Sequence, residues 1–405
     1  MKRGFLAAAL LIASSAYAGS TFKVLHSFHC DPSGCGPTGG LVFDDAGNLY
    51  GTTGGGGDAD ATVFRLSPSS DGQWTYRLLY TLTISQGSAV EPSLTLDPAG
   101  NLYGTSINGG AHDVGSVFEL SRDPAVTGGW SLRVLHSFLN TYEDGQYPWD
   151  KVILDKAGNV YGTTRYGGPE DAAGGVVFEL TPGTGGDWGE DILYDFPSYR
   201  GGCCPYAEVI FDEAGDLYGT TPGGGTGNGD GTVFKLTHTA SGWKEALVHS
   251  FQGPDGSFPI TGLVFDAKGN LYGTTQEGGG YNSGTVFQLA PTATGRWKET
   301  ILYDFPQFRN GGGPVSTPAF DKAGNLYGTA AGGIGPCSGG CGVVYKLAPG
   351  SSGKWTYSVL HRFTDKGDGA EPNGAVVFDK TGTHLYGTAI FGGTYNQGVV
   401  YEITP

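Results

Sequence analysis

Short apolar runs separated by glycine-rich turns dominate the chain. In residues 258–305, each run is four to eight residues long, rich in β-branched or aromatic side chains, and bounded by Gly, Pro, Asn or Asp. Runs of this length and composition predict β-strands. This segment is therefore expected to form four strands, which begin near residues 263, 270, 285 and 297.

The first of these strands is predicted to lie deepest in the fold. Leu263, Val264 and Phe265 are apolar on consecutive residues, which indicates burial on both faces of the strand. The following turn places Gly269 where a hairpin favours a positive φ, and Asn270 opens the next strand. The first two strands should therefore pair antiparallel.

The phrase NLYGT, or a close variant, occurs seven times along the chain. Its tyrosines lie 53 to 59 residues apart, at Tyr50, Tyr103, Tyr161, Tyr218, Tyr272, Tyr327 and Tyr386. A four-stranded antiparallel unit repeated at about this length matches a β-propeller blade, which spans roughly 40 to 50 residues. The sequence therefore predicts an all-β fold: one seven-bladed β-propeller of four-stranded antiparallel blades over residues 19–405.

The outermost strand of the repeat predicts how the ring closes. Six copies of this strand begin with tryptophan, at Trp74, Trp130, Trp188, Trp243, Trp297 and Trp355, and recurrence at one phase indicates a packing role. The seventh copy is TFKVLHSF, residues 21–28, which precedes the first blade. We therefore expect the N-terminal strand to complete the last blade, which would remove an open sheet edge.

These repeats resemble the GloVer (Gloeobacter/Verrucomicrobia-type) tandem-repeat family of exported bacterial proteins. The resemblance rests on LYGTT, a GG loop and G-x-VF in this order, and it covers essentially all of the chain after residue 18. It implies an exported, surface-associated protein with a β-propeller-like fold. It supplies no catalytic residues.

The N-terminus is predicted to be an export signal. Lys2 and Arg3 precede an apolar stretch, and residues 16–18 (Ala-Tyr-Ala) match the pattern before a signal-peptidase cleavage site. Cleavage after Ala18 would change the formal net charge from −16 to −18, because two positive charges leave. We expect a secreted or periplasmic monomer with no membrane span. Its acidic surface disfavours binding to nucleic acid.

Six cysteines form three local groups. In an oxidising compartment, Cys30 with Cys35 and Cys337 with Cys341 are expected to form short-loop disulfides. Cys203 and Cys204 are adjacent in the sequence, and they are compatible with either a strained bridge or two thiols. A zinc site is disfavoured because the close pairs lie in different repeats.

The candidate ligand site lies on the rim where the loops vary most between repeats. A proline recurs seven residues before the end of the innermost strand, and Trp149 and Tyr206 follow it in two neighbouring repeats. Tyr142, Tyr147, Arg165 and Tyr166 are expected nearby. Flat aromatic rings beside carboxylates and amides suit a sugar ring, which stacks on one face and offers hydroxyls at its edge. The alternative is that these rings only cap the channel.

The same rim also carries candidate catalytic residues. Hydrolysis of a glycoside would use two carboxylates, for which Glu91, Asp150 and Glu208 are candidates. Elimination on a uronate would use a Tyr or His base and an Arg, for which His112, Arg165 and Tyr166 are candidates. Neither set has a diagnostic spacing, so the sequence leaves the question of an enzyme open.

No cofactor motif is present. Asp58, Asp60 and Asp230 lie in acid-rich loops that could supply Ca²⁺ ligands, but the sequence favours solvated turn residues, because the twelve-residue EF-hand pattern is missing. His26, His136, His249 and His361 share one phase of the outermost strand, which indicates a structural role. The sequence therefore favours an exported, non-catalytic binding protein for a glycan or protein ligand. The alternative is a carbohydrate-active enzyme, either a polysaccharide lyase or a glycoside hydrolase.

Overall fold

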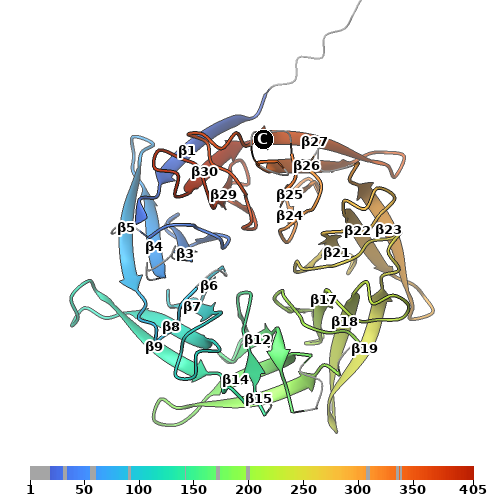
Figure 1. Ribbon diagram of the computed structural model, residues 1–405, viewed down its shortest axis with the longest axis horizontal. Helices are drawn as coiled ribbons and strands as arrows, with labels where there is room; N and C mark the ends of the chain where they lie inside the picture. The colour runs from blue at the N-terminus through green and yellow to red at the C-terminus, as the bar shows by residue number, and fades with distance from the viewer. Residues whose placement is uncertain are drawn as a thin grey trace, which may run out of the picture.

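The fold is a closed ring of seven β-sheets (Figure 1). This computed structural model describes residues 19–30, 34–54, 61–89, 93–141, 143–169, 174–197, 201–306, 311–333, 337 and 340–405. Within these ranges every named element is a strand. No helix there is long and apolar enough to cross a membrane. The export signal predicted for residues 1–18 lies outside the described residues.

The first four blades follow one another in sequence order, each with its first strand innermost. Blade 1 contains β2 (Val42–Phe43), β3 (Leu49–Thr53), β4 (Thr62–Pro68) and β5 (Trp74–Thr81). Blade 2 contains β6 (Thr95–Leu96), β7 (Leu102–Ser106), β8 (Ser116–Arg122) and β9 (Trp130–Ser137). Blade 3 contains β11 (Ile153–Leu154), β12 (Val160–Thr164), β14 (Val176–Pro182) and β15 (Trp188–Asp195). Blade 4 contains β16 (Ile210–Phe211), β17 (Leu217–Thr221), β18 (Thr232–Thr239) and β19 (Gly242–Ser250).

The remaining blades complete the ring. Blade 5 contains β20 (Val264–Phe265), β21 (Leu271–Thr275), β22 (Thr285–Pro291) and β23 (Trp297–Asp304). Blade 6 contains β24 (Ala319–Phe320), β25 (Leu326–Ala330), β26 (Val343–Pro349) and β27 (Trp355–Arg362). Blade 7 contains β28 (Val377–Phe378), β29 (Leu385–Ala389), β30 (Val399–Thr404) and β1 (Thr21–Ser27). A further two-stranded sheet joins β10 (Gly145–Gln146) to β13 (Tyr166–Gly167).

The N-terminal strand closes the ring, as predicted. β1 pairs antiparallel with β30, from Thr21 opposite Thr404 to Ser27 opposite Val399. Figure 1 shows β1 beside β30, so the two ends of the described chain meet in blade 7. Phe22 of β1 also stacks on His361 of blade 6, with ring centres 3.7 Å apart.

The repeated motif builds each blade through contacts that recur around the ring. In blade 5, the Asp266 carboxylate accepts hydrogen bonds from the Asn270 backbone N–H at 2.9 Å, its side-chain amide at 2.7 Å, and the Tyr272 hydroxyl at 3.1 Å. At Gly273 a Cβ atom would lie 2.6 Å from the Phe287 ring, so glycine is required there. The motif therefore fixes the first turn and brings the second strand against the third.

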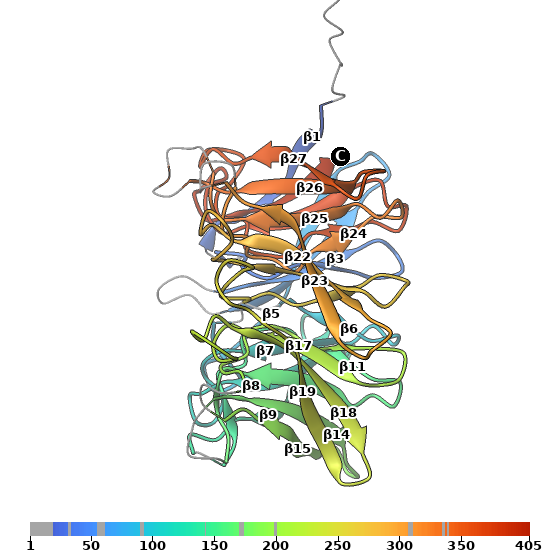
Figure 2. The ribbon, with the colours of Figure 1, turned by 90° about the vertical axis from the view of Figure 1, so that its right-hand side faces the viewer.

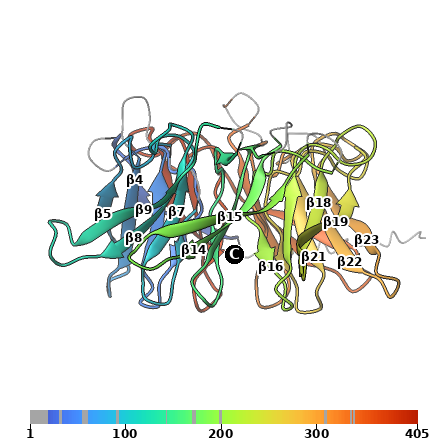
Figure 3. The same cartoon turned by 90° about the horizontal axis from the view of Figure 1, so that it is seen from below.

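The hydrophobic core lies between neighbouring blades. The first residue of each second strand, leucine in six blades and Val160 in blade 3, is fully buried, and so are at least three residues of each third strand. The tryptophan that begins an outer strand contacts the second-strand tyrosine of the preceding blade: Trp297 meets Tyr218 at 6.1 Å between ring centres, and Trp355 meets Tyr272 at 6.4 Å. Each blade is therefore stabilised by its neighbours. Figure 2 and Figure 3 show the resulting disc from its side.

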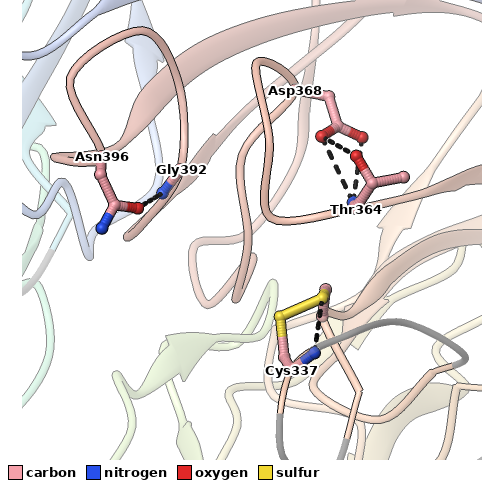
Figure 4. The surroundings of a disulfide bond; sticks show 6 residues. Cys337, Thr364, Asp368, Gly392 and Asn396 are labelled. Atoms are coloured by element: carbon pink, nitrogen blue, oxygen red, sulfur yellow. Dashed lines mark hydrogen bonds between the residues drawn. A yellow bond between two sulfur atoms is a disulfide. The ribbon is translucent and has the colours of Figure 1, made fainter.

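One of the two predicted short-loop disulfides is formed. A disulfide joins Cys337 to Cys341 in the connection between β25 and β26 (Figure 4). The predicted bridge between Cys30 and Cys35 is absent, because Cys30 carries a free thiol. Gly36 hydrogen-bonds to Gln397 and Gly54 on two neighbouring blades, and this anchoring buries Cys35 at 1% exposure while Cys30 stays half-buried. The spacing of the two cysteines in the sequence gives no sign of this difference in burial.

Candidate functional site

Six recurring prolines shape one mouth of the central channel. Each proline leads into an innermost strand, and several pack closely against a glycine of the preceding blade. A Cβ atom added to Gly115 would lie 2.6 Å from Pro148, and one added to Gly231 would lie 2.5 Å from Pro259. The residues that directly follow the prolines all line one cavity of about 250 Å³. These residues are Thr38, Trp149, Tyr206, Ile260, Val315 and Asn373.

This cavity, which we call the channel mouth, has walls of different character. Blades 3 and 4 contribute the aromatic rings of Trp149 and Tyr206, blades 5 and 6 contribute aliphatic groups, and blades 7 and 1 contribute Asn373 and Thr38. The ring centres of Trp149 and Tyr206 lie 5.2 Å apart and their planes are tilted by 46°. Phe258 extends the aromatic wall, with its ring centre 6.5 Å from that of Tyr206. The predicted aromatic pair is therefore brought together.

An arginine lies among the aromatic rings. The guanidinium carbon of Arg165 is 4.4 Å from the ring centre of Tyr206, 4.8 Å from that of Tyr166 and 5.5 Å from that of Trp149. Cations over ring faces are attracted by the ring quadrupole. The Arg165 backbone N–H donates to the Tyr147 carbonyl at 3.1 Å, and the β10–β13 ladder pairs Gln146 with Tyr166. This small sheet places Arg165 and Tyr166 beside the mouth.

The remaining predicted aromatic residues differ in position. Tyr147 meets Tyr166 edge to face, with ring centres 6.2 Å apart, and it does not line the channel mouth. Its φ of 58° is left-handed, which marks a sharp turn before Pro148. Tyr142 lies outside the described residues. Tyr147 therefore packs against Tyr166 of the arginine cluster and does not form part of the cavity wall.

Three charged residues form the floor of the mouth. Lys151 Nζ lies 3.2 Å from Glu208 Oε1, and Asp150 Oδ2 accepts the Glu208 backbone N–H at 3.2 Å. The Glu208 side chain is 4% exposed. At Gly262 a Cβ atom would lie 2.5 Å from the Glu208 carboxyl group, so glycine lets blade 5 approach it. Sequence reasoning missed Lys151, although it directly follows Asp150 and is positively charged.

The pKa values of the two acids of the floor are shifted in opposite directions. Burial and the neighbouring Glu208 carboxylate raise the pKa of Asp150 well above its usual range. Burial also disfavours ionisation of Glu208, but the Lys151 ammonium and hydrogen bonds from Asp150 and Lys151 outweigh it and lower the Glu208 pKa. Asp150 is therefore the acid of this pair whose protonated form is favoured, and Glu208 is the one whose ionised form is favoured, next to Lys151. The floor is therefore polar, with a lysine between two carboxyl groups.

The catalytic arrangements considered from the sequence are not assembled at this mouth. The carboxyl groups of Asp150 and Glu208 contact each other directly, whereas glycosidases hold theirs roughly 5 to 9 Å apart. Glu91 lies outside the described residues, and exposed His112 does not line the mouth. Arg165 and Tyr166 do lie together, without His112. The described residues therefore present a polar cradle with an aromatic wall.

Two thiols lie close to the arginine cluster. Cys203 and Cys204 both carry free thiols, whereas the sequence was compatible with either a bridge between them or two thiols. A hydrogen bond from the Cys204 thiol lowers the pKa of Cys203 more than burial raises it, and the Arg165 charge adds to the lowering. The same hydrogen bond and burial raise the pKa of Cys204. Any thiolate in this pair is therefore expected on Cys203.

The acid-rich loops considered for Ca²⁺ have no assembled site among the described residues. Asp58 and Asp60 lie outside the described ranges. Asp230 Oδ1 accepts a hydrogen bond from Ser257 Oγ at 3.1 Å, and its backbone carbonyl accepts from Phe258 N–H at 2.9 Å. Asp230 belongs to neither of the two described groups of three or more ligand-bearing side chains that could hold an ion. These two hydrogen bonds indicate that Asp230 stabilises the conformation of its loop.

Comparison with known proteins identifies the repeat. A family model described as the Gloeobacter/Verrucomicrobia repeat matches residues 59–264 and 228–405. None of the curated proteins compared with the chain matches it.

Two solved structures share the propeller fold at low sequence identity. PorZ, described as an essential bacterial surface component of the type-IX secretion system of Porphyromonas gingivalis, matches with a TM-score of 0.52 and 14% identity, over 93% of this chain and 48% of that one. An ancestral GH74 enzyme matches with a TM-score of 0.52 and 11% identity, over 89% and 55%. This chain thus spans about half the length of both proteins. Identities this low show the fold alone.

Proposed function

This chain belongs to the Gloeobacter/Verrucomicrobia repeat family, and we propose that it is an exported binding protein that recognises a glycan at the channel mouth. The observation that carries this proposal is the pairing of Trp149 with Tyr206 above a polar floor. A sugar ring offers an apolar face for such rings and hydroxyls for the groups below them. Sites of this kind sit where variable loops meet a rigid scaffold.

The size and chemistry of the channel mouth restrict the range of ligands that can bind there. A cavity of about 250 Å³ is slightly smaller than the roughly 300–1,000 Å³ typical of pockets for drug-sized ligands, so it suits a single sugar residue or a chain end. Asn373 and Gln276 in the lining offer amide donors and acceptors, and Lys151 offers a charged donor. A sugar unit that stacks on the aromatic wall can therefore direct its hydroxyls to the opposite wall.

A binding role fits the floor better than catalysis does. Glu208 is buried against Lys151 and hydrogen-bonds with Asp150, so the two acids do not face each other across an open gap. Burial raises the pKa of Tyr206, which makes it a poor base near neutral pH. The acids and the tyrosine are thus suited to hold hydroxyl groups.

The test uses the protein without residues 1–18 and a panel of neutral and uronate-containing polysaccharides. Pull-down reports binding, and every polysaccharide that is retained is then assayed for new reducing ends and for unsaturated products. The proposal expects retention without product. Product formation would identify an enzyme, and retention of no polysaccharide by the folded protein would turn the search to protein partners.

A further inference from the structure

Two clusters of metal-ligand side chains lie on the outer wall of the ring, away from the channel mouth. The first cluster contains His136, Asp144 and Glu190: His136 Nε2 is 3.1 Å from Asp144 Oδ2 and 3.5 Å from Glu190 Oε2. The second cluster contains His249, Asp255 and Glu299, with corresponding distances of 3.2 and 3.9 Å. In each cluster the three ligand atoms lie within 4.8 Å of one another.

The fold builds the two clusters in the same way. The histidine comes from an outermost strand, β9 or β19, and directly follows the unpaired residue of a bulge in that strand, Leu135 or Val248. Bulges re-aim the side chains that follow them. The aspartate comes from the connection that leaves this strand, and the glutamate comes from the outermost strand of the next blade, β15 or β23. Each cluster therefore bridges two blades.

The carboxylates are held in place before any ion arrives. Asp144 is 3% exposed and accepts backbone hydrogen bonds from Leu139 at 2.7 Å and Gly145 at 2.6 Å. Asp255 accepts one from Gln252 at 2.7 Å. The His136 and Glu190 side chains are 18% and 17% exposed, so an ion can enter from solvent.

The equivalent positions in other blades show what a purely structural contact looks like. At three other interfaces between blades the same pair of positions stacks two rings: His26 with Tyr76, Tyr303 with Tyr357, and Phe22 with His361, at centre distances of 4.2, 4.3 and 3.7 Å. In the two clusters a glutamate replaces the second ring. Glu190 Oε1 and Glu299 Oε1 are then buried with no hydrogen-bond partner among the described residues. Such orphaned buried atoms require an explanation.

We propose that each of the two clusters binds one divalent transition-metal ion, with Zn²⁺ as the ion it suits best. Zn²⁺ takes imidazole nitrogen and carboxylate oxygen in tetrahedral sites at about 2.0–2.2 Å, which separates neighbouring ligand atoms by roughly 3.3–3.6 Å. The measured separations from His136 and His249 bracket this range. Three protein ligands leave a fourth position for water. Ca²⁺ fits poorly, because it prefers six to eight oxygen ligands. The ion would clamp blade 2 to blade 3 and blade 4 to blade 5.

The test counts bound zinc in tag-free protein that has been stripped with a chelator and then dialysed against Zn²⁺. Elemental analysis and calorimetric titration should both give two ions per chain, and Ca²⁺ should give no binding heat. Glu190→Gln and Glu299→Gln preserve side-chain shape, and each should reduce the count from two to one; the double variant should bind none. Asp144→Asn and Asp255→Asn provide second variants at each cluster.

The matched control is His361→Gln. His361 lies 3.1 Å from Asp368 but faces Phe22 where the clusters have glutamate, so this variant should keep both ions (Figure 4 shows Asp368). Circular dichroism confirms folding of each variant before the count. The proposal is overturned if the folded wild-type protein takes up no zinc, or if the double glutamate variant still binds two ions.

Discussion

The Arg165 guanidinium lies 4.4 Å from the ring centre of Tyr206 and is held among three aromatic rings. Its Nε atom is buried and has no hydrogen-bond partner in the described part of the chain. The arginine is thus positioned chiefly by ring faces. Tyr206 lines the channel mouth, and the Arg165 guanidinium contacts its ring without lining the cavity itself. The aromatic wall and the arginine therefore form one structural unit.

Arg165→Ala should loosen this wall. A cation–π contact contributes about 0.5–2 kcal/mol depending on its exposure, so we expect the free energy of unfolding to fall by about 1 kcal/mol in urea titration. Arg165→Lys should recover little of the loss, because an ammonium lacks the planar face that stacks on rings. Arg77→Ala is the control, since Arg77 is exposed and donates to the Gly128 carbonyl elsewhere. Equal stability of Arg165→Ala and Arg77→Ala would contradict the claim that Arg165 stabilises the aromatic wall.

Gly273→Ala should destabilise the propeller strongly. A Cβ atom there would lie 2.6 Å from Phe287 and 2.8 Å from Leu263, both of which are buried. Overpacking of this kind costs about 1–3 kcal/mol, measurable as a lower urea midpoint. Gly367→Ala is the matched control, because nothing lies within 4 Å of its added Cβ and its φ is not positive. A harmless Gly273→Ala would mean that the blade can expand at this contact.

The turn aspartates should make stability fall in acid. Burial is the largest single influence on the pKa of Asp266 and raises it, but the hydrogen bonds from Asn270, Lys268 and Tyr272 together outweigh burial and lower the pKa below the usual value. A carboxyl whose folded pKa is lowered stabilises the protein above its unfolded pKa of about 3.9, and this contribution is lost as the pH falls through the folded pKa. The same direction holds for Asp44, Asp321 and Asp379.

Thermal unfolding between pH 6 and pH 2.5 measures this effect. The melting temperature of the wild-type protein should drop across the acid range, and Asp266→Asn should lower it at pH 6 while making the drop shallower. Asp187→Asn, at an exposed turn, should leave both values unchanged. If the melting temperature of Asp266→Asn fell with pH as steeply as that of the wild-type protein, Asp266 would not contribute to the loss of stability in acid.

Ring closure depends on the N-terminal strand. Phe22 packs against His361, Phe363 and Tyr401 across blades 6 and 7. Phe22→Ala should therefore cost about 2–4 kcal/mol of unfolding free energy, as expected for removing a large packed ring. Deletion of residues 19–28 should expose the edge of β30 and cause self-association, visible by light scattering. A stable monomer after this deletion would contradict closure by β1.

The sequence predicted most of the fold because each feature recurs in phase. Tyr272, Gly273 and Asp266 make the same local contacts that their counterparts make in other blades, so a single repeat indicates the blade and the count of repeats indicates the ring. The position of β1 followed from the missing outermost strand. Local contacts and their repetition were enough for this level of the structure.

The site was predicted only in part, because its contacts cross between blades. Trp149 and Tyr206 follow recurring prolines on neighbouring blades, so their meeting could be expected. The direct contact of Asp150 with Glu208 and the ion pair with Lys151 depend on the channel width, which all seven blades set together. The recurrence of His136 in phase indicates a structural role, and its approach to Glu190 depends on which residue the next blade places beside it.

The most direct test of the central claim is a glycan array probed with wild-type protein, Trp149→Ala and Tyr281→Ala at equal concentrations. Tyr281 is a suitable control because it is 59% exposed in the connection between β21 and β22 and does not line the channel mouth. The account predicts a defined set of bound glycans for the wild-type protein and Tyr281→Ala, and loss of at least tenfold in signal for folded Trp149→Ala. Equal binding by all three proteins would place recognition elsewhere and contradict the account.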